Sequence, residues 1–113
     1  MSAEVTRDKH AIVHADGEID LANIDQFIEA LDEAAEKSPT GFIIDLSDVT
    51  YIDSAGVQAI FGVYSKMRAA DGCLAVVIGN ARIKSVLEVV HLELLPNMSV
   101  CDDLDAARQA VSS

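Results

Sequence analysis

One serine is the strongest candidate for chemistry in this chain because of its neighbours. Ser54 follows an aspartate and precedes two small residues, in the sequence DSAG at residues 53–56. A strand-like run at residues 42–46 lies before it, and a helix-like run at residues 57–70 comes after it. Free N–H groups and the helix dipole favour negative charge at a helix N-terminus. These residues allow three roles for Ser54: helix cap, nucleophile or phosphorylation site.

A catalytic role for Ser54 has little support in the surrounding sequence. The serine follows Ile52 and Asp53 and therefore does not lie in the G-x-S-x-G turn of the hydrolases. His10, His14 and His91 are the candidate general bases, and no local motif connects any of them to Ser54. We therefore predict a protein that is not an enzyme.

The acidic residues offer a second chemistry, in which Asp45 would accept a phosphoryl group. That reaction needs a metal held by further carboxylates, and no adjacent acidic pair follows an early buried strand. We expect Asp45 and Asp48 to cap a turn before Thr50 instead, although a metal cluster with Asp53 stays open. The glycines are scattered and form no phosphate-binding loop. No cofactor or metal is predicted.

A phosphorylated Ser54 would act as a local binding switch. The phosphoryl group adds about −1.5 to −2 charge beside Asp53. The helix N-terminus could hold that charge without disrupting the fold. An acidic or apolar partner surface packed over Ser54 would be repelled and desolvated.

The helix that begins near Ser54 has an unusual outer face. Small or uncharged residues dominate the face opposite its apolar stripe, with a single charge, and they are Ala55, Gln58, Ala59, Gly62, Ser65 and Lys66. Gly62 inside a helix costs about 1 kcal/mol relative to alanine. Two explanations remain open: close packing of Gly62 against another element of this chain, or a partner helix lying along the face.

Composition limits the class of protein and of partner. The 113 residues are 50% hydrophobic, which suits one domain over residues 1–113. The formal net charge of −11 argues against direct contact with nucleic acid or an anionic membrane, and favours a protein partner with basic patches. No signal peptide or membrane-spanning apolar stretch is visible. We expect a cytoplasmic protein without membrane insertion.

Strand-like and helix-like segments alternate along the chain. We expect strand structure over residues 4–20, with a turn or bulge at residues 16–17, and further strands at 42–46, 73–78 and 98–101. The helices are expected from Asn23, as the N-cap of a capping box with Gln26, and then over 57–70, around 83–90 and over 104–111. The first should bury Ile24, Phe27, Ile28, Leu31 and Ala35, the second Val57, Ile60, Phe61, Tyr64 and Met67.

This alternation predicts an α/β fold in which about four helices pack on a mainly parallel sheet of four to five strands. Cys73 should begin one strand and Cys101 should end another. In parallel strands the two thiols would then lie too far apart to form a disulfide.

Two stretches resemble the STAS domain family, which includes the anti-sigma factor antagonists. Residues 17–20 (GEID) resemble the family's G-E-L-D stretch, and residues 45–56 (DLSDVTYIDSAG) resemble its D-L-S-x-V-x-x-[IM]-D-S-[SA]-G motif. Residues 81–92 resemble the segment that follows. One departure is His91, where many relatives have Gly or Ser, and it could alter the end of that helix.

The resemblance implies a regulator that switches partners. Such a protein, when unphosphorylated, binds an anti-sigma factor that is also a serine kinase, and so frees a sigma factor. The kinase phosphorylates the motif serine, here Ser54, and a serine phosphatase reverses the reaction. The partner-binding residues would be Asp20, Leu21, Ala22, Asn23, Asp53, Ala55 and Gly56, with Gln58, Ala59 and Gly62 from the helix face. The alternative is a STAS subunit of a stress-signalling or phospholipid-transport complex.

Overall fold

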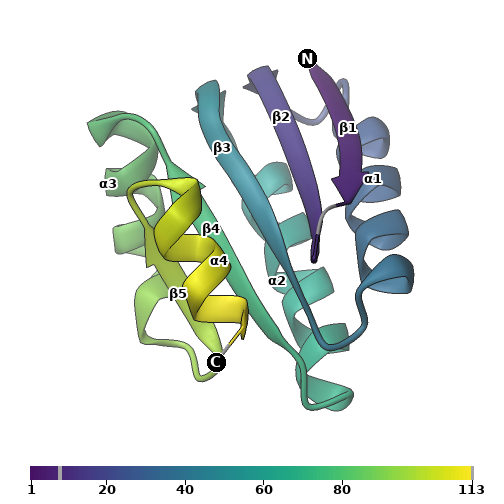
Figure 1. The fold of residues 1–113 in the computed structure, drawn as a ribbon. Coiled ribbons are helices and arrows are strands. Elements are labelled where there is room, and N and C mark those ends of the chain that lie inside the picture. The colour runs from purple at the N-terminus through teal and green to yellow at the C-terminus, as the bar shows by residue number, and fades with distance from the viewer. Residues whose placement is uncertain (8, 113) are drawn as a thin grey trace.

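The computed structural model describes residues 1–7 and 9–112 and contains a five-stranded mixed sheet. The elements in chain order are β1 (Ser2–Arg7), β2 (Ala11–Ile19), α1 (Ile24–Lys37), β3 (Gly41–Ile52), α2 (Ser54–Ala69), β4 (Cys73–Ile78), α3 (Ala81–Val89), the short 3-10 helix η1 (Leu92–Leu94), β5 (Met98–Cys101) and α4 (Leu104–Ser112). The strands lie side by side in sequence order; β1 is antiparallel to β2, and all other neighbours are parallel (Figure 1). The predicted α/β architecture is confirmed.

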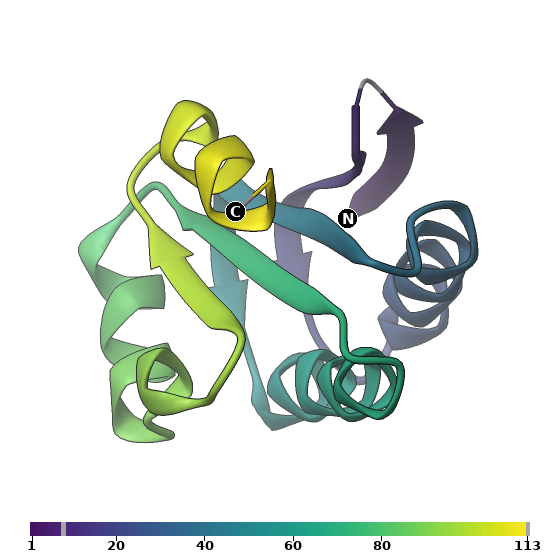
Figure 2. The same cartoon turned by 60° about the horizontal axis from the view of Figure 1, so that its bottom comes forward.

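Helices cover the two faces of the sheet unequally. Helices α1, α2 and α3 pack on one face, and α4 alone lies on the other (Figure 2). The central strand β3 serves both cores because successive side chains point to opposite faces. Phe42 and Ile44 contribute to the large core under α1–α3, whereas Ile43 contributes to the small core under α4.

Strand β3 is longer than the sequence suggested. The strand expected at residues 42–46 is present, but it continues to Ile52, so the turn that Asp45 and Asp48 were expected to cap is wrong. Its second half pairs with β2, and the pairing shifts register twice, once beside Gly17. Gly17 has a φ of +73°, which only glycine adopts readily, so the irregularity expected at residues 16–17 is a bulge. The long strand carries Asp53 to the edge of the sheet where β2 also ends.

The two long helices follow the predicted patterns, although Ile24 and Phe61 are only half-buried and Ile28 is exposed. In α2 the other predicted residues are buried, and Val63 is buried in addition. In α1 Ala30 and Ala34 are buried beside Phe27 and Leu31, while Ile28 is 40% exposed. The burial predicted for Ile28 is therefore wrong, because the small alanines let α1 lie close to the sheet and turn Ile28 outward.

The cysteines lie where the sequence placed them. Cys73 begins β4 and Cys101 ends the neighbouring parallel strand β5, and both are free thiols. Burial raises the pKa of both thiols, and Asp103 and Asp102 raise that of Cys101 further. Near this end of the chain α3 stops at Val89, and His91 adopts a left-handed φ of 57° before η1.

Candidate functional site

The Ser54 site is organised by the carboxylate of Asp53. Asp53 is the N-cap of α2, and its Oδ1 accepts hydrogen bonds from the backbone N–H groups of Ala55 (2.9 Å) and Gly56 (3.3 Å). Ser54 is the first helical residue and is exposed. The capping role is therefore filled by Asp53, which leaves the hydroxyl of Ser54 on the surface at the start of the helix.

The same carboxylate connects this helix to the loop at residues 20–23. Oδ2 of Asp53 accepts a hydrogen bond from the backbone N–H of Leu21 (3.1 Å), and the N–H of Asp53 donates to the carbonyl of Ile19 (3.1 Å). One side chain thus fixes the loop after β2 against the first turn of α2. The loop and Ser54 form one continuous surface.

Bonds within the loop set its shape. Asn23 accepts a hydrogen bond on Oδ1 from the N–H of Asp20 (3.0 Å) and donates from Nδ2 to the carbonyl of Glu18 (2.9 Å). Oδ1 of Asp20 accepts from the N–H of Ala22 (3.0 Å). Asn23 is the N-cap residue of α1, as predicted, but the capping box with Gln26 is wrong, because the Asn23 side chain bonds within the loop and makes no cap bond to α1. Leu21 is left 75% exposed at the tip.

Gly56 and Gly62 lie on the same helix in opposite environments. A Cβ on Gly56 would lie 2.6 Å from Cγ1 of Ile52 and 2.9 Å from Cγ2 of Ile19, so only glycine lets α2 start this close to the sheet. Apart from its chain neighbours and the backbone of its own helix, a Cβ on Gly62 would meet no atom of the described chain within 4 Å. Of the two explanations left open for Gly62, close packing within this part of the chain is excluded.

Gly62 faces a groove of about 410 Å³ between α1 and α2. It is lined by Leu21, Ile24, Ile28, Leu31, Asp32, Ala55, Gln58, Ala59, Gly62, Val63 and Lys66. Its lining is mostly apolar, and one end lies beside the Ser54 loop through Leu21 and Ala55. The ion pair between Lys66 Nζ and Asp32 Oδ1 (3.1 Å) joins the two helices at the surface. Because Leu21 and Ala55 belong to both, the groove continues the surface that carries Ser54.

The structure brings most of the predicted binding residues together. The loop residues, Asp53 and Ala55 surround Ser54, while Gln58, Ala59 and Gly62 line the adjoining groove. Gly56 is buried and positions the helix. Sequence reasoning missed Ile24, Ile28 and Val63 as groove residues. For Ile24 and Ile28 the available signal was the width of the apolar stripe on α1, which covers more surface than the sheet buries.

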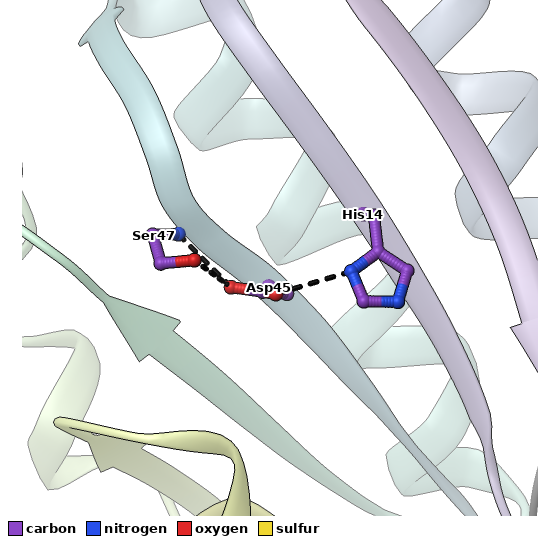
Figure 3. Close-up of polar contacts among 3 residues, drawn as sticks. All are labelled: His14, Asp45 and Ser47. Carbon is purple, nitrogen blue, oxygen red and sulfur yellow. Dashed lines mark hydrogen bonds and ion pairs between the residues drawn. The ribbon is translucent and has the colours of Figure 1, made fainter.

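A separate polar cluster lies on the face of the sheet opposite α2 (Figure 3). Oδ2 of Asp45 contacts Nδ1 of His14 on the adjacent strand (3.1 Å), and Oδ1 accepts from the N–H (3.0 Å) and the Oγ–H (2.6 Å) of Ser47. Asp45 is only 7% exposed, and these bonds compensate its burial. His14 and Ser47 both contact Asp45 and not each other, which is not the geometry of a base and its nucleophile.

The positions of the acidic groups also bear on the metal hypothesis. Asp45 belongs to this cluster on the sheet, whereas Asp53 caps α2. In the described parts of the chain, no group of three or more His, Cys, Asp or Glu residues is arranged to hold a metal ion. Asp45, Asp48 and Asp53 therefore form no such group.

The fold, the long motif and the loop at Ser54 define a class of protein. The family model of the STAS domain matches residues 2–107, which is nearly the whole chain. The protein therefore belongs to the STAS domain family. No curated protein matches the sequence significantly.

Solved structures share this fold over the full domain. An anti-sigma factor antagonist from Mycobacterium paratuberculosis is 24% identical and superposes with a TM-score of 0.87, covering 99% of this chain and 94% of that chain. A STAS domain protein from Planctomyces limnophilus, also described as an anti-sigma-factor antagonist, is 15% identical, with a TM-score of 0.79 and full coverage of both chains. The Bacillus cell fate determinant SpoIIAA in its phosphorylated form is 17% identical, with a TM-score of 0.71 over 96% of this chain and 98% of that one. At these identities the likeness establishes the fold.

None of the helices in the described residues is both long enough and apolar enough to cross a bilayer.

Proposed function

We propose that this protein is an anti-sigma factor antagonist controlled by phosphorylation at Ser54. Unphosphorylated, it binds an anti-sigma factor that is also a serine kinase, and a sigma factor is released. The kinase transfers a phosphoryl group to the Ser54 hydroxyl, and the complex separates. A serine phosphatase restores the binding form. The protein is itself a non-catalytic binding module and meets these partners in the cytoplasm.

The observation that carries this proposal is the exposed Ser54 hydroxyl beside a capping carboxylate. Asp53 already accepts two N–H groups of the first turn of α2. A phosphoryl group on Ser54 therefore competes with a carboxylate for the positive end of the helix, and part of its charge stays uncompensated. Two neighbouring anionic groups on one surface repel an acidic partner and are costly to desolvate under an apolar one.

The groove adds the apolar contact area that a partner needs and that Ser54 alone does not provide. Leu21 and Ile28 are exposed, and Ala55, Ala59 and Gly62 give the α2 side a low profile. A partner helix along α2 would bury this apolar surface while its end covers Ser54. Phosphorylation would act at the edge of that contact without any change in the fold.

The test is phosphoryl transfer and binding with the purified cognate kinase and ATP. Labelling should occur on the wild-type protein and vanish in Ser54→Ala. The matched control is Ser65→Ala, which removes an exposed serine from the same helix and should leave labelling intact. Ser54→Asp should lose the kinase complex, whereas Ser54→Ala should keep it. Labelling that survives in Ser54→Ala would refute the site.

Affinity capture from the native cell distinguishes the alternative role in a larger complex. Recovery of an anti-sigma kinase supports the antagonist. Recovery of stress-complex or phospholipid-transport subunits with no kinase would contradict it and favour a structural STAS subunit.

A further inference from the structure

A second hollow lies far from Ser54, on the face of the sheet that carries α4. It has a volume of about 290 Å³ and is lined by Lys9, His10, Ile12, Ile43, Arg108 and Ser112. Ile12 and Ile43 lie near the starts of two parallel strands, whereas Ser54 follows the end of β3. Figure 2 shows α4 and the β1–β2 hairpin rising on the same side of the sheet, on either side of β3. The hollow thus lies at the opposite end and on the opposite face from the Ser54 site.

The charge at this hollow is opposite to that of the protein as a whole. The chain has eight Lys and Arg residues and three His residues against 19 acidic ones. The cationic side chains of Lys9 and Arg108 nevertheless come together here, beside His10, from the connection between β1 and β2 and from helix α4. In a chain of net charge −11, a local cationic group attracts small anions to one place.

The side chain of Arg108 has N–H donors that a ligand could bind. Nη1 of Arg108 contacts Oδ1 of Asp105 at 3.4 Å, and the carboxylate is 89% exposed. A long contact to an exposed partner is weak and engages one of the five N–H donors of a guanidinium. Nε2 of His10 lies 3.1 Å from Oγ of Ser112, which connects the hairpin to the end of α4. Polar groups therefore converge on the hollow from two sides.

The floor of the hollow is apolar. Ile12 and Ile43 are register partners on β2 and β3, and they are 4% and 0% exposed. A cationic rim over an apolar floor suits a ligand that has an anionic group on an apolar body. The volume, at the lower end of the range for small-molecule sites, limits that body to about the size of one ring.

We propose that this hollow binds a small organic anion, a carboxylate or phosphate monoester on a flat apolar body. Arg108 binds the anionic oxygens through paired N–H groups, and Lys9 adds a point charge. The body of the ligand lies over Ile12 and Ile43. His10 and Ser112 hold the hairpin and α4 together at the rim. This site is independent of the function proposed for Ser54.

The test is a titration of the ¹⁵N-labelled full chain, followed by amide chemical shifts. The probes share one ring: benzoate as the carboxylate, phenyl phosphate as the phosphate ester and benzyl alcohol as the neutral control. We expect saturable shifts centred on residues 9–12, 43 and 108–112 with at least one anion, and none with benzyl alcohol. The anion that binds more tightly identifies the class of ligand.

Variants then separate the site from general charge effects. Arg108→Gln, and separately Lys9→Gln, should weaken the anion by about tenfold. Lys84→Gln removes an equal charge from the exposed face of α3 and should leave the affinity unchanged. The proposal is overturned if neither anion saturates, if benzyl alcohol gives the same shifts, or if the shifts map elsewhere. Unchanged affinity in a folded Arg108→Gln protein also overturns it.

Discussion

Removal of the Asp53 side chain is the most informative structural perturbation. In Asp53→Ala the N–H groups of Ala55 and Gly56 lose their cap, and the N–H of Leu21 loses its acceptor. Loss of a cap costs about 0.5–2 kcal/mol. The Leu21 bond lies at the surface, so we assign it the low end of the range for hydrogen bonds, about 0.5–1 kcal/mol. The free energy of unfolding should fall by about 2 kcal/mol.

Urea denaturation followed by far-ultraviolet circular dichroism measures that loss. In thermal unfolding, the same change lowers Tm by roughly 10 °C for a domain of this size. Asp53→Ser is the matched variant: its hydroxyl caps α2 but is too short to reach Leu21 as well. We expect it to recover about 1 kcal/mol.

Amide hydrogen exchange separates the two roles of Asp53. In Asp53→Ser the N–H of Leu21 should exchange faster than in the wild type, while Ala55 and Gly56 stay protected. The account is refuted if Asp53→Ala unfolds within about 0.5 kcal/mol of the wild type. It is equally refuted if exchange at Leu21 is unchanged in both variants, because the loop would then be held by other contacts.

Three further predictions use neighbouring features. Gly56→Ala should destabilise the protein by about 1–3 kcal/mol, because the added Cβ collides with Ile52. Gly62→Ala should stabilise it by about 0.5–1 kcal/mol, because alanine is the better helix former and the added Cβ meets no neighbour. Changes of the same sign in the free energy of unfolding of both variants, measured by denaturation, would contradict the helix geometry. His91→Gly should stabilise by up to about 1 kcal/mol by relieving the left-handed φ, checked by Tm; a fall in Tm would contradict it. Alkylation of Cys73 and Cys101 by iodoacetamide depends on the thiolate, and burial raises both pKa values. The rate should therefore reach half its maximum at a higher pH than that of free cysteine; an equal or lower midpoint would refute the burial argument.

The sequence was sufficient for the architecture and for the place of Ser54. Alternating apolar runs predicted the strands and helices, and the motif at residues 45–56 placed an aspartate and a serine at a helix start. Both types of signal are local, since capping and periodicity depend on neighbours in the chain. The structure places Ser54 at the start of α2, as predicted, and adds that Asp53 is the cap and that the helix begins at Ser54 itself.

The errors concern residues whose role depends on distant partners. Polar residues after Leu46 resemble a turn, yet β2 pairs with them and keeps them in a strand. Asn23 matches a capping box, but Asp20 and Glu18 bind its side chain. Ile28 fits a helical stripe, and only the packing of α1 against the sheet reveals that it is exposed.

Only one of the two walls of the groove could be predicted from the sequence, for the same reason. Its α2 wall follows from the small residues Ala55, Ala59 and Gly62. Its α1 wall depends on how far apart two helices lie on the sheet, which no local pattern encodes.

The central claim is that Ser54 is the switch, and one measurement tests it most directly. The protein is isolated from its native cell and its phosphorylation sites are mapped by mass spectrometry, with a strain carrying Ser54→Ala as the control. The account predicts a phosphoryl group on Ser54 in the wild type, and a protein without phosphate in the Ser54→Ala strain. A protein phosphorylated at another residue, with Ser54 unmodified under every growth condition, would contradict it.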